Sequence, residues 1–484
     1  LLLAPLACAC GMATKEIMVT APVVVLLFDR TFVGGSFPVA WSARRRIHLS
    51  LASTWVLLLF LLVDVQERGV GYVAITGWQY ALTSCQSLLA YLRLALWPAP
   101  LVFDYGTDFV RTWSQGWPAV AAVALLAGGT TWALWRTPRL GFLGAWIFVL
   151  LSPTTSLVPV AGQPLAEHRM YLPLAAVTVA AAFAAHRWLR RGGIPVLLGL
   201  AALLLAATYA RNHDYRDAVT LWTDTVAKRP HNARAHAALG AALIERRAWA
   251  PGIAALERSV QLDPASGEAR NNLATALTEV NRTPEALGHF IAALRLRPGI
   301  ASTHYNFGNA LLSVGRASEA IAQQEQALIL LPEFPLARCA LAQAQLAAGQ
   351  REPAIANFRA ALRNQPDLIA AHFGLANALA QSGRAPDAIP HYEATLRAVP
   401  NAVDAHYHFG NALLALNRPA EAAQRFAAAL QLQPDFAEAH HYLAKALGQL
   451  GRRAEAIKHY ETALQLRPDF TATRTNLEAL RKAQ

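Results

Sequence analysis

The stretch GIASTHYNFGNALLSVGRASEAIAQQEQALILLP, residues 299–332, is one copy of a pattern that fills the second half of this 484-residue chain. A proline closes each copy, and a leucine or phenylalanine follows that proline by nine positions. This period predicts pairs of helices that stack side by side, because proline ends the second helix and large apolar residues fill the space between helices. The prolines are each 34 residues apart: Pro230, Pro264, Pro298, Pro332, Pro366, Pro400, Pro434 and Pro468.

A second row of residues marks the turn inside each copy. Glycine or asparagine recurs there at one offset, and both readily adopt the left-handed conformation that ends a helix. The row consists of Gly315, Gly349, Gly383, Gly451, Asn281 and Asn417. Each copy also has small residues at the positions where its two helices approach each other. Together these features resemble the tetratricopeptide repeat at its characteristic positions. It predicts a connecting helix at 210–232, seven repeats over 233–470 and a capping helix at 471–484.

The first 209 residues have a different composition. They consist largely of Leu, Ala, Val and Trp, with charges in short clusters such as SARRRIH and RWLRRGG. Arginine beside an apolar span normally sets the orientation of a membrane protein, so the net charge of +12 does not indicate nucleic acid as a partner. The four cysteines have neither CxxC spacing nor histidines at metal spacing, so we expect inert thiols and assign no metal ligands.

Apolar runs in this first half are long enough to cross a membrane, which takes about 20 residues. The clear candidates are 47–63, 117–135, 141–158, 170–186 and 193–209. Residues 1–12 and 17–28 are shorter and are interpreted as a cut helix and its antiparallel partner, so we expect the given sequence to begin inside a membrane helix. Residues 78–97 carry two glutamines and an arginine within an apolar run, and they either span the membrane or lie in its interface.

The positions of the arginines predict a topology. The clusters within 30–46, 136–139 and 187–191 fall in loops that we place on the cytoplasmic side, provided that 78–97 does not cross. The repeats then follow on the external side. Polar groups from separate segments also meet on that external face: Lys15, Glu16, Asp104, Asp108, Glu167, His168 and Arg169.

The first helix of each repeat carries a row of polar and aromatic side chains. They are Asn272, Asn306, Asn309, Asn377, Asn411, Tyr305, Phe373 and Tyr407. Asparagine is a poor helix former, and its amide can hydrogen-bond an extended peptide backbone without demanding a particular sequence. These residues are therefore candidates for a peptide-binding groove. The alternative is that the asparagines only solvate the groove and the aromatic rings pack between helices.

Three segments of the first half resemble one family when they are taken together with the repeats. They are ATKEIMVTAPVVVLLFD (13–29), YLRLALWPAPLVFDY (91–105) and LSPTTSLVPVAGQPLAEHRMYLP (151–173). The chain in this respect is similar to the transmembrane and tetratricopeptide-repeat-containing protein O-mannosyltransferases and their bacterial relatives. One departure is His168, which stands where that family commonly runs directly from Glu to Arg.

The resemblance implies an all-α protein in which a partial, polytopic membrane bundle of the GT-C glycosyltransferase type precedes a repeat solenoid. It implies transfer of a sugar, mannose in that family, from a polyprenyl-phosphate donor to Ser or Thr of external proteins that the repeats recruit. Arg169 would bind the donor phosphate, and Glu167 would orient either Arg169 or the acceptor. Lys15 and Glu16 would form the opposing wall. The family's acidic base lies in a loop that has no counterpart here, so we assign no catalytic base and expect no activity from this chain alone.

Two other interpretations stay open. The EHR segment (167–169) can be an interfacial ion pair, and the whole chain can be a membrane-anchored scaffold for protein–protein interaction in envelope assembly or polysaccharide export. The number of apolar spans favours the enzyme over a simple anchor. Alanine- and arginine-rich usage with short loops is typical of a high-GC bacterium, which predicts the inner membrane as the location and the periplasm as the site of the repeats. The need for a divalent metal is left open.

Overall fold

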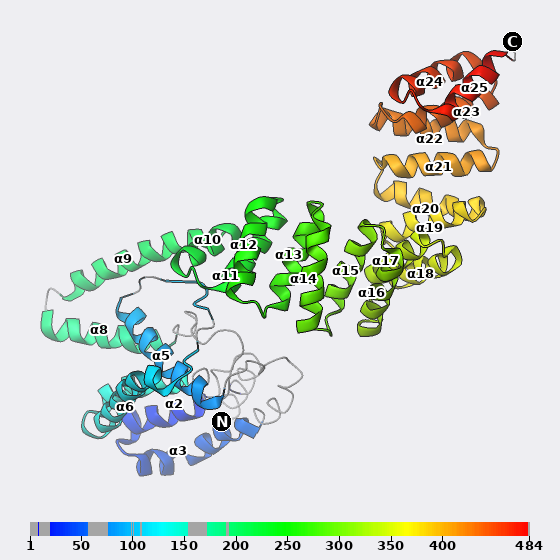
Figure 1. The fold of residues 1–484 in the computed structure, drawn as a ribbon. Coiled ribbons are helices and arrows are strands. Elements are labelled where there is room, and N and C mark those ends of the chain that lie inside the picture. The colour runs from blue at the N-terminus through cyan, green and yellow to red at the C-terminus, as the bar shows by residue number, and fades with distance from the viewer. Residues whose placement is uncertain are drawn as a thin grey trace. The chain divides into compact units, whose positions relative to one another are not determined.

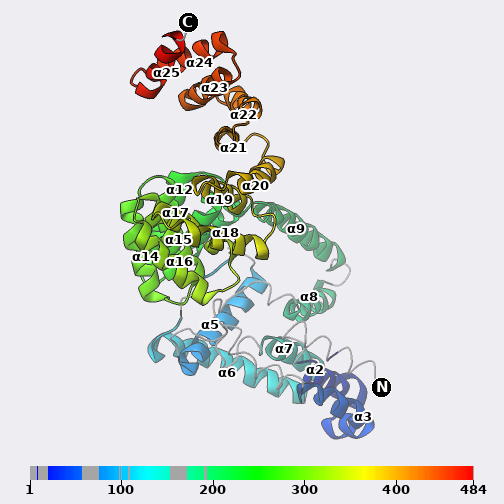
Figure 2. The ribbon, with the colours of Figure 1, turned by 90° about the vertical axis from the view of Figure 1, so that its right-hand side faces the viewer.

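The computed structural model describes residues 8, 20–56, 76–97, 99, 101–106, 109–152, 172–189 and 193–482. Within these residues every regular element is a helix, as the all-α prediction requires (Figures 1 and 2). The chain divides into two compact units, Leu1–Pro264 and Ala265–Gln484. The first repeat therefore belongs to the same unit as the N-terminal helices. The boundary between the units lies after this repeat, whereas the change in composition lies before it.

Unit 1 contains a series of helices joined by short segments. The helices are α2 (Ala21–Phe28), the π-helical η2 (Asp29–Gly34), α3 (Phe37–Ala52), α5 (Gly77–Leu96), α6 (Trp113–Arg136), α7 (Pro138–Leu151), α8 (Pro173–Leu189), α9 (Gly193–Asp214), α10 (Ala218–Lys228), α11 (Ala233–Glu245) and α12 (Trp249–Leu262). Neighbouring helices in this series pack against each other, as α5 does on α6 and α6 does on α7.

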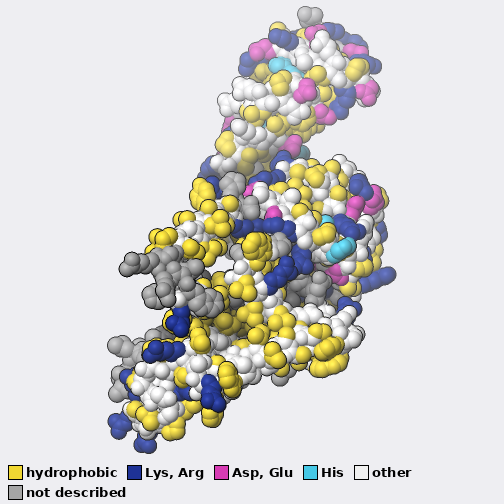
Figure 3. All heavy atoms as spheres, turned by 90° about the vertical axis from the view of Figure 1, so that its left-hand side faces the viewer, with side chains coloured by type: hydrophobic (Ala, Val, Ile, Leu, Met, Phe, Trp, Pro, Cys, Tyr) yellow, Lys and Arg dark blue, Asp and Glu magenta, His cyan; other side chains and the backbone are white. Residues whose placement is uncertain are grey.

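Among the residues of unit 1 that the structure describes, two helices are long and apolar enough to cross a membrane by length and composition. They are Trp113–Arg136, which is α6, and Ile194–Asn212, which lies within α9. Their side chains face outward: Leu125 and Trp135 are both 78% exposed. Hydrophobic side chains cover much of the unit 1 surface in Figure 3, and Asp and Glu gather on the repeats. Because α7 and α8 are shorter and 57–75 lies outside the described residues, the polytopic bundle stays a prediction.

The basic cluster at 44–46 lies in a helix and not in the loop that the sequence predicted. It falls inside α3, which bends at Arg44, where the backbone has φ −131°. Arg44 Nη1 donates to Asp29 Oδ1 at 3.0 Å, and Asp29 is 2% exposed. His48 Nε2 lies 3.3 Å from Asp29 Oδ2. The buried carboxylate holds the basic segment against η2, a tertiary contact that the apolar pattern alone does not predict.

The segment whose placement stayed open, 78–97, forms α5. Thr76 and Gln79 begin this helix with a reciprocal capping box. Its glutamines turn toward the start of α6, where Gln79 Nε2 donates to the Arg111 carbonyl and Gln86 Nε2 to the Gln115 carbonyl. The two glutamines that interrupt the apolar run therefore join α5 to its neighbour.

Unit 2 is a stack of helix pairs closed by a single helix (Figures 1 and 2). The helices are α13 (Gly267–Glu279), α14 (Thr283–Leu296), α15 (Ala301–Ser313), α16 (Ala317–Leu330), α17 (Pro335–Ala347), α18 (Arg351–Asn364), α19 (Ile369–Gln381), α20 (Ala385–Ala398), α21 (Val403–Ala415), α22 (Pro419–Leu432), α23 (Ala437–Gln449), α24 (Arg453–Leu466) and α25 (Thr471–Lys482). We call the first helix of each pair the A helix and the second the B helix, beginning with α11 and α12. Each A helix packs most extensively on its own B helix.

The turn between the A and B helices requires a left-handed residue. The predicted glycines and asparagines adopt it, with φ from +56° at Asn417 to +79° at Gly349. Nothing lies within 4 Å of a Cβ built on Gly315, so backbone conformation and not space selects glycine there. Arg247 occupies the same place in the first repeat at φ +59°, and the sequence pattern did not reveal it.

Replacing Arg247 by glycine is expected to stabilise unit 1. A left-handed conformation costs an L-residue roughly 1–2 kcal/mol, and the greater freedom of glycine in the unfolded chain offsets part of the gain, so the net increase is about 0.5–1 kcal/mol. Thermal unfolding of the full chain measures it. The reciprocal change, Gly315→Arg, is expected to lower stability, and an equal unfolding temperature for Arg247→Gly and the parent would contradict the assignment.

Candidate functional site

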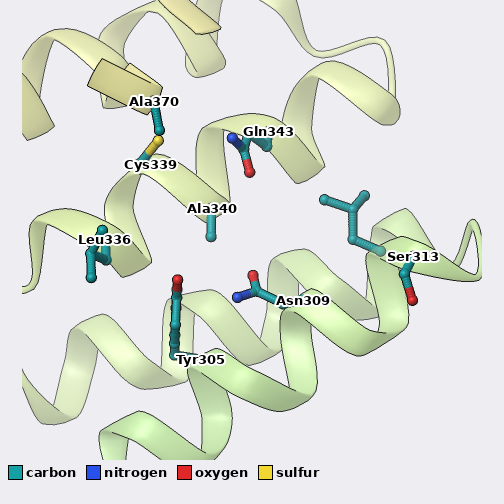
Figure 4. A pocket seen from close by; sticks show the side chains of 9 residues that line it. Tyr305, Asn309, Ser313, Leu336, Cys339, Ala340, Gln343 and Ala370 are labelled. Atoms are coloured by element: carbon teal, nitrogen blue, oxygen red, sulfur yellow. The ribbon is translucent and has the colours of Figure 1, made fainter. Parts of the chain in front are cut away.

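An open pocket of about 310 Å³ lies between the A helices of consecutive repeats. Figure 4 shows Tyr305 and Asn309 on α15 turned toward α17, and Cys339 of α17 beside Ala370 of α19. The residues that line the pocket are Tyr305, Asn309, Leu312, Ser313, Leu336, Cys339, Ala340, Gln343 and Ala370. All of them belong to A helices. We call the surface that these offsets form along the A helices the A-face.

A second pocket of about 300 Å³ is formed by α13, the end of α14 and the start of α15, with Asn271 and Asn272 in its wall. Their amides form a chain: Asn306 Nδ2 donates to Asn271 Oδ1 at 3.3 Å, and Asn271 Nδ2 donates to Asn272 Oδ1 at 3.2 Å. The predicted Asn272 and Asn306 are therefore joined through Asn271, which sequence reasoning missed. Its signal was available, because Asn271 stands 34 residues before Tyr305.

The three asparagines that share one offset differ in their partners. Asn309 Oδ1 accepts from Gln324 Nε2 at 3.1 Å, and Asn377 Oδ1 accepts from the Tyr392 hydroxyl at 2.7 Å. Each of these partners lies fifteen positions later, on the B helix of the same repeat. Fifteen positions after Asn411 stands Phe426, which offers no polar group, and Asn411 Oδ1 is buried without a hydrogen-bond partner.

The aromatic candidates contact neighbouring rings and also keep part of their surface exposed. The Tyr305 ring centroid lies 5.2 Å from that of Phe334, and the Tyr407 ring lies 4.9 Å from Phe436. Phe373 contacts Tyr392 on the B helix at 6.5 Å. All three candidates are half-buried. Packing between helices and availability to a ligand therefore coexist at these positions.

A side chain near the start of an A helix contacts the proline turn before it in most repeats. His304 Nε2 lies 3.0 Å from the Pro298 carbonyl oxygen, and a histidine or arginine makes the same contact with the proline six residues earlier in other repeats. Since a carbonyl oxygen only accepts, these rings carry a proton on Nε2. The recurrent histidines thus anchor the proline turn.

Family models of the tetratricopeptide repeat match residues 203–267, 271–337 and 339–403, and two others match 379–446 and 437–470. These matches together span more than half of the chain.

The chain belongs to the tetratricopeptide-repeat family.

Several solved structures resemble parts of this chain. YrrB, described as having an unusual peptide-binding site, is 23% identical and covers 38% of this chain and 96% of its own, with a TM-score of 0.33. Pseudomonas aeruginosa pilF is 19% identical, covers 44% and 97%, and has a TM-score of 0.40. The Cut9–Hcn1 assembly of the APC/C is 16% identical, covers 65% of each chain, and has a TM-score of 0.46. No curated protein matches significantly.

Two tetratricopeptide repeats carry a pair of histidines in direct contact. His372 Nδ1 lies 2.9 Å from His391 Nδ1, and His440 Nδ1 lies 2.9 Å from His459 Nδ1. Because His372 and His440 carry their proton on Nε2, their Nδ1 atoms accept, and the B-helix histidines donate. Burial, followed by the neighbouring histidine, lowers the pKa of His391 and of His459. Neutral rings are therefore preferred in the folded repeats.

Acid is expected to destabilise these two repeats. Above about pH 6.5, the ordinary histidine pKa, the rings of His391 and His459 are neutral in the folded and the unfolded chain, so the full stability is present. As the pH falls through the lowered pKa values, the unfolded chain binds more protons, so stability is lost. Arg359 and Lys458 add to the effect, and Asp387 and Glu455 oppose it. Thermal unfolding of the full chain at about pH 7.5 and about pH 5.5 measures the loss.

The chain supplies a matched variant for this pH dependence. Gln323 stands opposite His304 at 2.8 Å, in the place that His391 and His459 occupy opposite their partners. Its amide can accept or donate, so it tolerates a protonated ring. A double variant, His391→Gln with His459→Gln, is expected to lose less stability in acid than the parent. Equal losses in the two proteins would contradict the role of the histidine pairs.

Cys339 is the thiol in the wall of the A-face pocket. It is 3% exposed, and burial raises its pKa to about 12. A thiol with this pKa stays protonated at neutral pH and is a poor nucleophile. The thiol serves as a small apolar side chain between two repeats.

Of the polar candidates in the first half, the structure describes only Asp104. Lys15, Glu16, Asp108, Glu167, His168 and Arg169 lie outside the described residues. Asp104 is 1% exposed, and Arg234 Nε of α11 donates to its Oδ2 at 2.8 Å. The Gly106 amide donates to Oδ1 at 2.8 Å, and Asn232 Nδ2 donates to the Asp104 carbonyl at 3.0 Å. In the described structure Asp104 thus holds the segment 101–106 against the first repeat.

Proposed function

We propose that this chain is a membrane-anchored scaffold whose tetratricopeptide repeats bind segments of partner proteins along the A-face. Tetratricopeptide repeats are protein–protein interaction scaffolds, and the observation that carries the proposal is the open A-face pocket of about 310 Å³. Its wall combines apolar area with amides: Leu336 is 44% exposed, and Gln343 is exposed beside it. Such a surface can bury an apolar side chain while an amide meets the backbone of the bound segment.

The membrane anchor in this proposal rests on unit 1. Leu203 and Leu205 of α9 are 67% and 72% exposed, and Leu125 of α6 is 78% exposed. Apolar surface of this extent is stable when lipid or another protein covers it. The proposal places α6 and α9 in a membrane, the inner membrane of a bacterium, with the repeats on the external, periplasmic side as the arginine pattern predicts.

Site-specific cross-linking in living cells tests the scaffold. A photoreactive residue at Gln343, exposed on the A-face, is expected to capture a protein partner. The matched control is Gln326, which is exposed on the B helix α16 of a neighbouring repeat. Capture at Gln343 and not at Gln326, lost when Tyr305 is replaced by alanine, supports the proposal. Identical products at both positions, or none at Gln343, would refute it.

Glycosyltransferase activity is a more specific prediction, which rests on the sequence resemblance alone. Transfer of a sugar from a polyprenyl phosphate to Ser or Thr would depend on Arg169, Glu167 and the wall of Lys15 and Glu16, all outside the described residues. The family models match the repeats and do not extend to these segments. The scaffold is therefore the stronger proposal. An assay of membranes that contain the intact reading frame, with Arg169→Ala alongside, would establish the enzyme if transfer occurs and the variant abolishes it.

A further inference from the structure

Two basic segments that are far apart in the sequence meet at one corner of unit 1. Arg44, at the bend of α3, bonds to Asp29 at the start of η2 at 3.0 Å. Further along η2, the Phe32 ring packs edge-on against Phe142 of α7, with 5.3 Å between the ring centroids. Arg139 lies one turn before Phe142, on the same face of α7. We call this surface the arginine corner, and its basic residues are Arg30, Arg44, Arg45, Arg46, Arg136 and Arg139.

The arginine corner carries an excess of positive charge. Asp29 is the only acidic residue in α2, η2, α3, α6 and α7, and it is buried and bonded to Arg44. All of the corner arginines except Arg30 are exposed. Figure 3 shows Lys and Arg side chains beside hydrophobic ones at the end of unit 1 that contains α3. A surface with six arginines and one buried carboxylate attracts anions.

Arg30 adds a charge that has no counter-charge among the residues that the structure describes. It is 8% exposed, its guanidinium lies 5.4 Å from the centroid of the Phe37 ring, and its Nε and Nη1 are buried without a hydrogen-bond partner. The adjacent Asp29 contacts Arg44 and His48 instead. A buried cation is costly, and a nearby anion reduces that cost. Arg30 therefore acts on an anion at the surface through its electric field, which the protein interior screens weakly, and not by direct contact.

The helices around the arginine corner also carry exposed aromatic rings, which are typical of a membrane–water interface. Trp132 and Trp135, near the end of α6, are 65% and 78% exposed, and Trp41 on α3 is 43% exposed. With 24 residues, α6 is about 36 Å long, which exceeds the ~30 Å of hydrocarbon in a bilayer. If α6 crosses the membrane as proposed above, Arg136 at its end lies at the level of the lipid headgroups.

Resting on the membrane anchor of the proposed function, we infer that the arginine corner is a binding site for the headgroup of an anionic phospholipid. The exposed guanidinium groups of Arg45, Arg46 and Arg139 bond the phosphate oxygens, which suit their planar forks. The acyl chains lie along the exposed apolar side chains of α6. The buried charge of Arg30 favours a headgroup of net negative charge over a zwitterionic one. By the predicted topology, this lipid belongs to the cytoplasmic leaflet, on the side opposite to the repeats.

Native mass spectrometry of the purified full chain in neutral detergent tests this inference. The probes, each added alone, are phosphatidylglycerol, phosphatidylcholine, soluble glycerol phosphate and a single-stranded oligonucleotide. The parent is expected to bind phosphatidylglycerol most tightly. Arg45→Gln with Arg46→Gln is expected to weaken that binding by about fivefold for each arginine removed. Arg136→Gln with Arg139→Gln is expected to weaken the same binding, because the two segments form one site.

Two further variants separate lipid binding from general charge and from folding. Arg93→Gln with Arg111→Gln removes the same charge from exposed positions that the predicted topology places on the external side, and it is expected to leave the affinity unchanged. Arg30→Met removes the buried charge and is expected to weaken phosphatidylglycerol binding without lowering the unfolding temperature of the lipid-free chain. A purely structural role of Arg30 would instead lower that temperature and leave the affinity unchanged.

The inference is overturned by equal affinity for the two phospholipids, by preference for glycerol phosphate or the oligonucleotide, or by full affinity after either corner pair is replaced. An equal loss of affinity in the variant of Arg93 and Arg111 would also overturn it. The proposed function is judged separately. Failure of the membrane anchor would appear as release of the parent chain from membranes by alkaline carbonate, and failure of the scaffold would appear in the cross-linking at Gln343.

Discussion

Replacing Arg234 by alanine is expected to lower the free energy of unfolding of unit 1 by about 3 kcal/mol. The reason is the position of Asp104, whose carboxylate is 1% exposed and receives Arg234 Nε at 2.8 Å. Removing the guanidinium leaves a buried carboxylate without its counter-charge. The backbone amide of Gly106 remains as a donor to it, and the 40% exposure of the Arg234 side chain keeps the loss at the lower end of the range for buried pairs.

Chemical denaturation of the full chain, followed by a probe in unit 1, measures this loss. Adding Asp104→Asn to Arg234→Ala removes the unpaired charge and is expected to recover part of the stability. Arg258→Ala, which removes an exposed arginine from the neighbouring helix α12, is the control and is expected to have little effect. An Arg234→Ala protein as stable as the parent would contradict the role of this ion pair.

Replacing Phe426 by alanine is expected to cost about 3–5 kcal/mol in the repeats around it. The ring is 0% exposed and fills the space between α21 and α22, where a Cβ built on Gly410 would lie 2.7 Å from its Cε1. Glycine at 410 and phenylalanine at 426 thus complement each other in volume. Removing the ring leaves a cavity that Gly410 cannot fill.

The loss at Phe426 is expected to be local, because each repeat contacts mainly its neighbours. Hydrogen exchange should show faster opening of α21–α23 and little change in α13–α15. Leu432→Ala on the same helix removes a side chain that is 42% exposed, and it serves as the control with a small expected effect. Uniformly faster exchange along the whole of unit 2 would contradict a local loss and indicate that the array unfolds as one block.

Much of the repeat architecture was predictable from the sequence. The repeat is visible in the prolines every 34 residues and in the small residues between them. Both act locally, because proline ends a helix and small residues permit close packing. The left-handed turns at Gly315 and Asn417 were predictable for the same reason. Arg247 was not, because arginine has no preference for that conformation and adopts it only where the surrounding helices impose it.

The positions of the candidate groove residues were predictable from the sequence, but the hydrogen-bond partners of their amides were not. The sequence by itself determined that Asn309, Asn377 and Asn411 share one face, because a repeat of constant length returns each offset to the same face. Only the tertiary structure decided that Asn309 and Asn377 bond to B-helix partners, whereas Asn411 bonds to Tyr407 on its own helix and its Oδ1 has no B-helix partner. That outcome depends on a B-helix residue fifteen positions away, and a hydrogen bond forms only when both partners are polar and in reach.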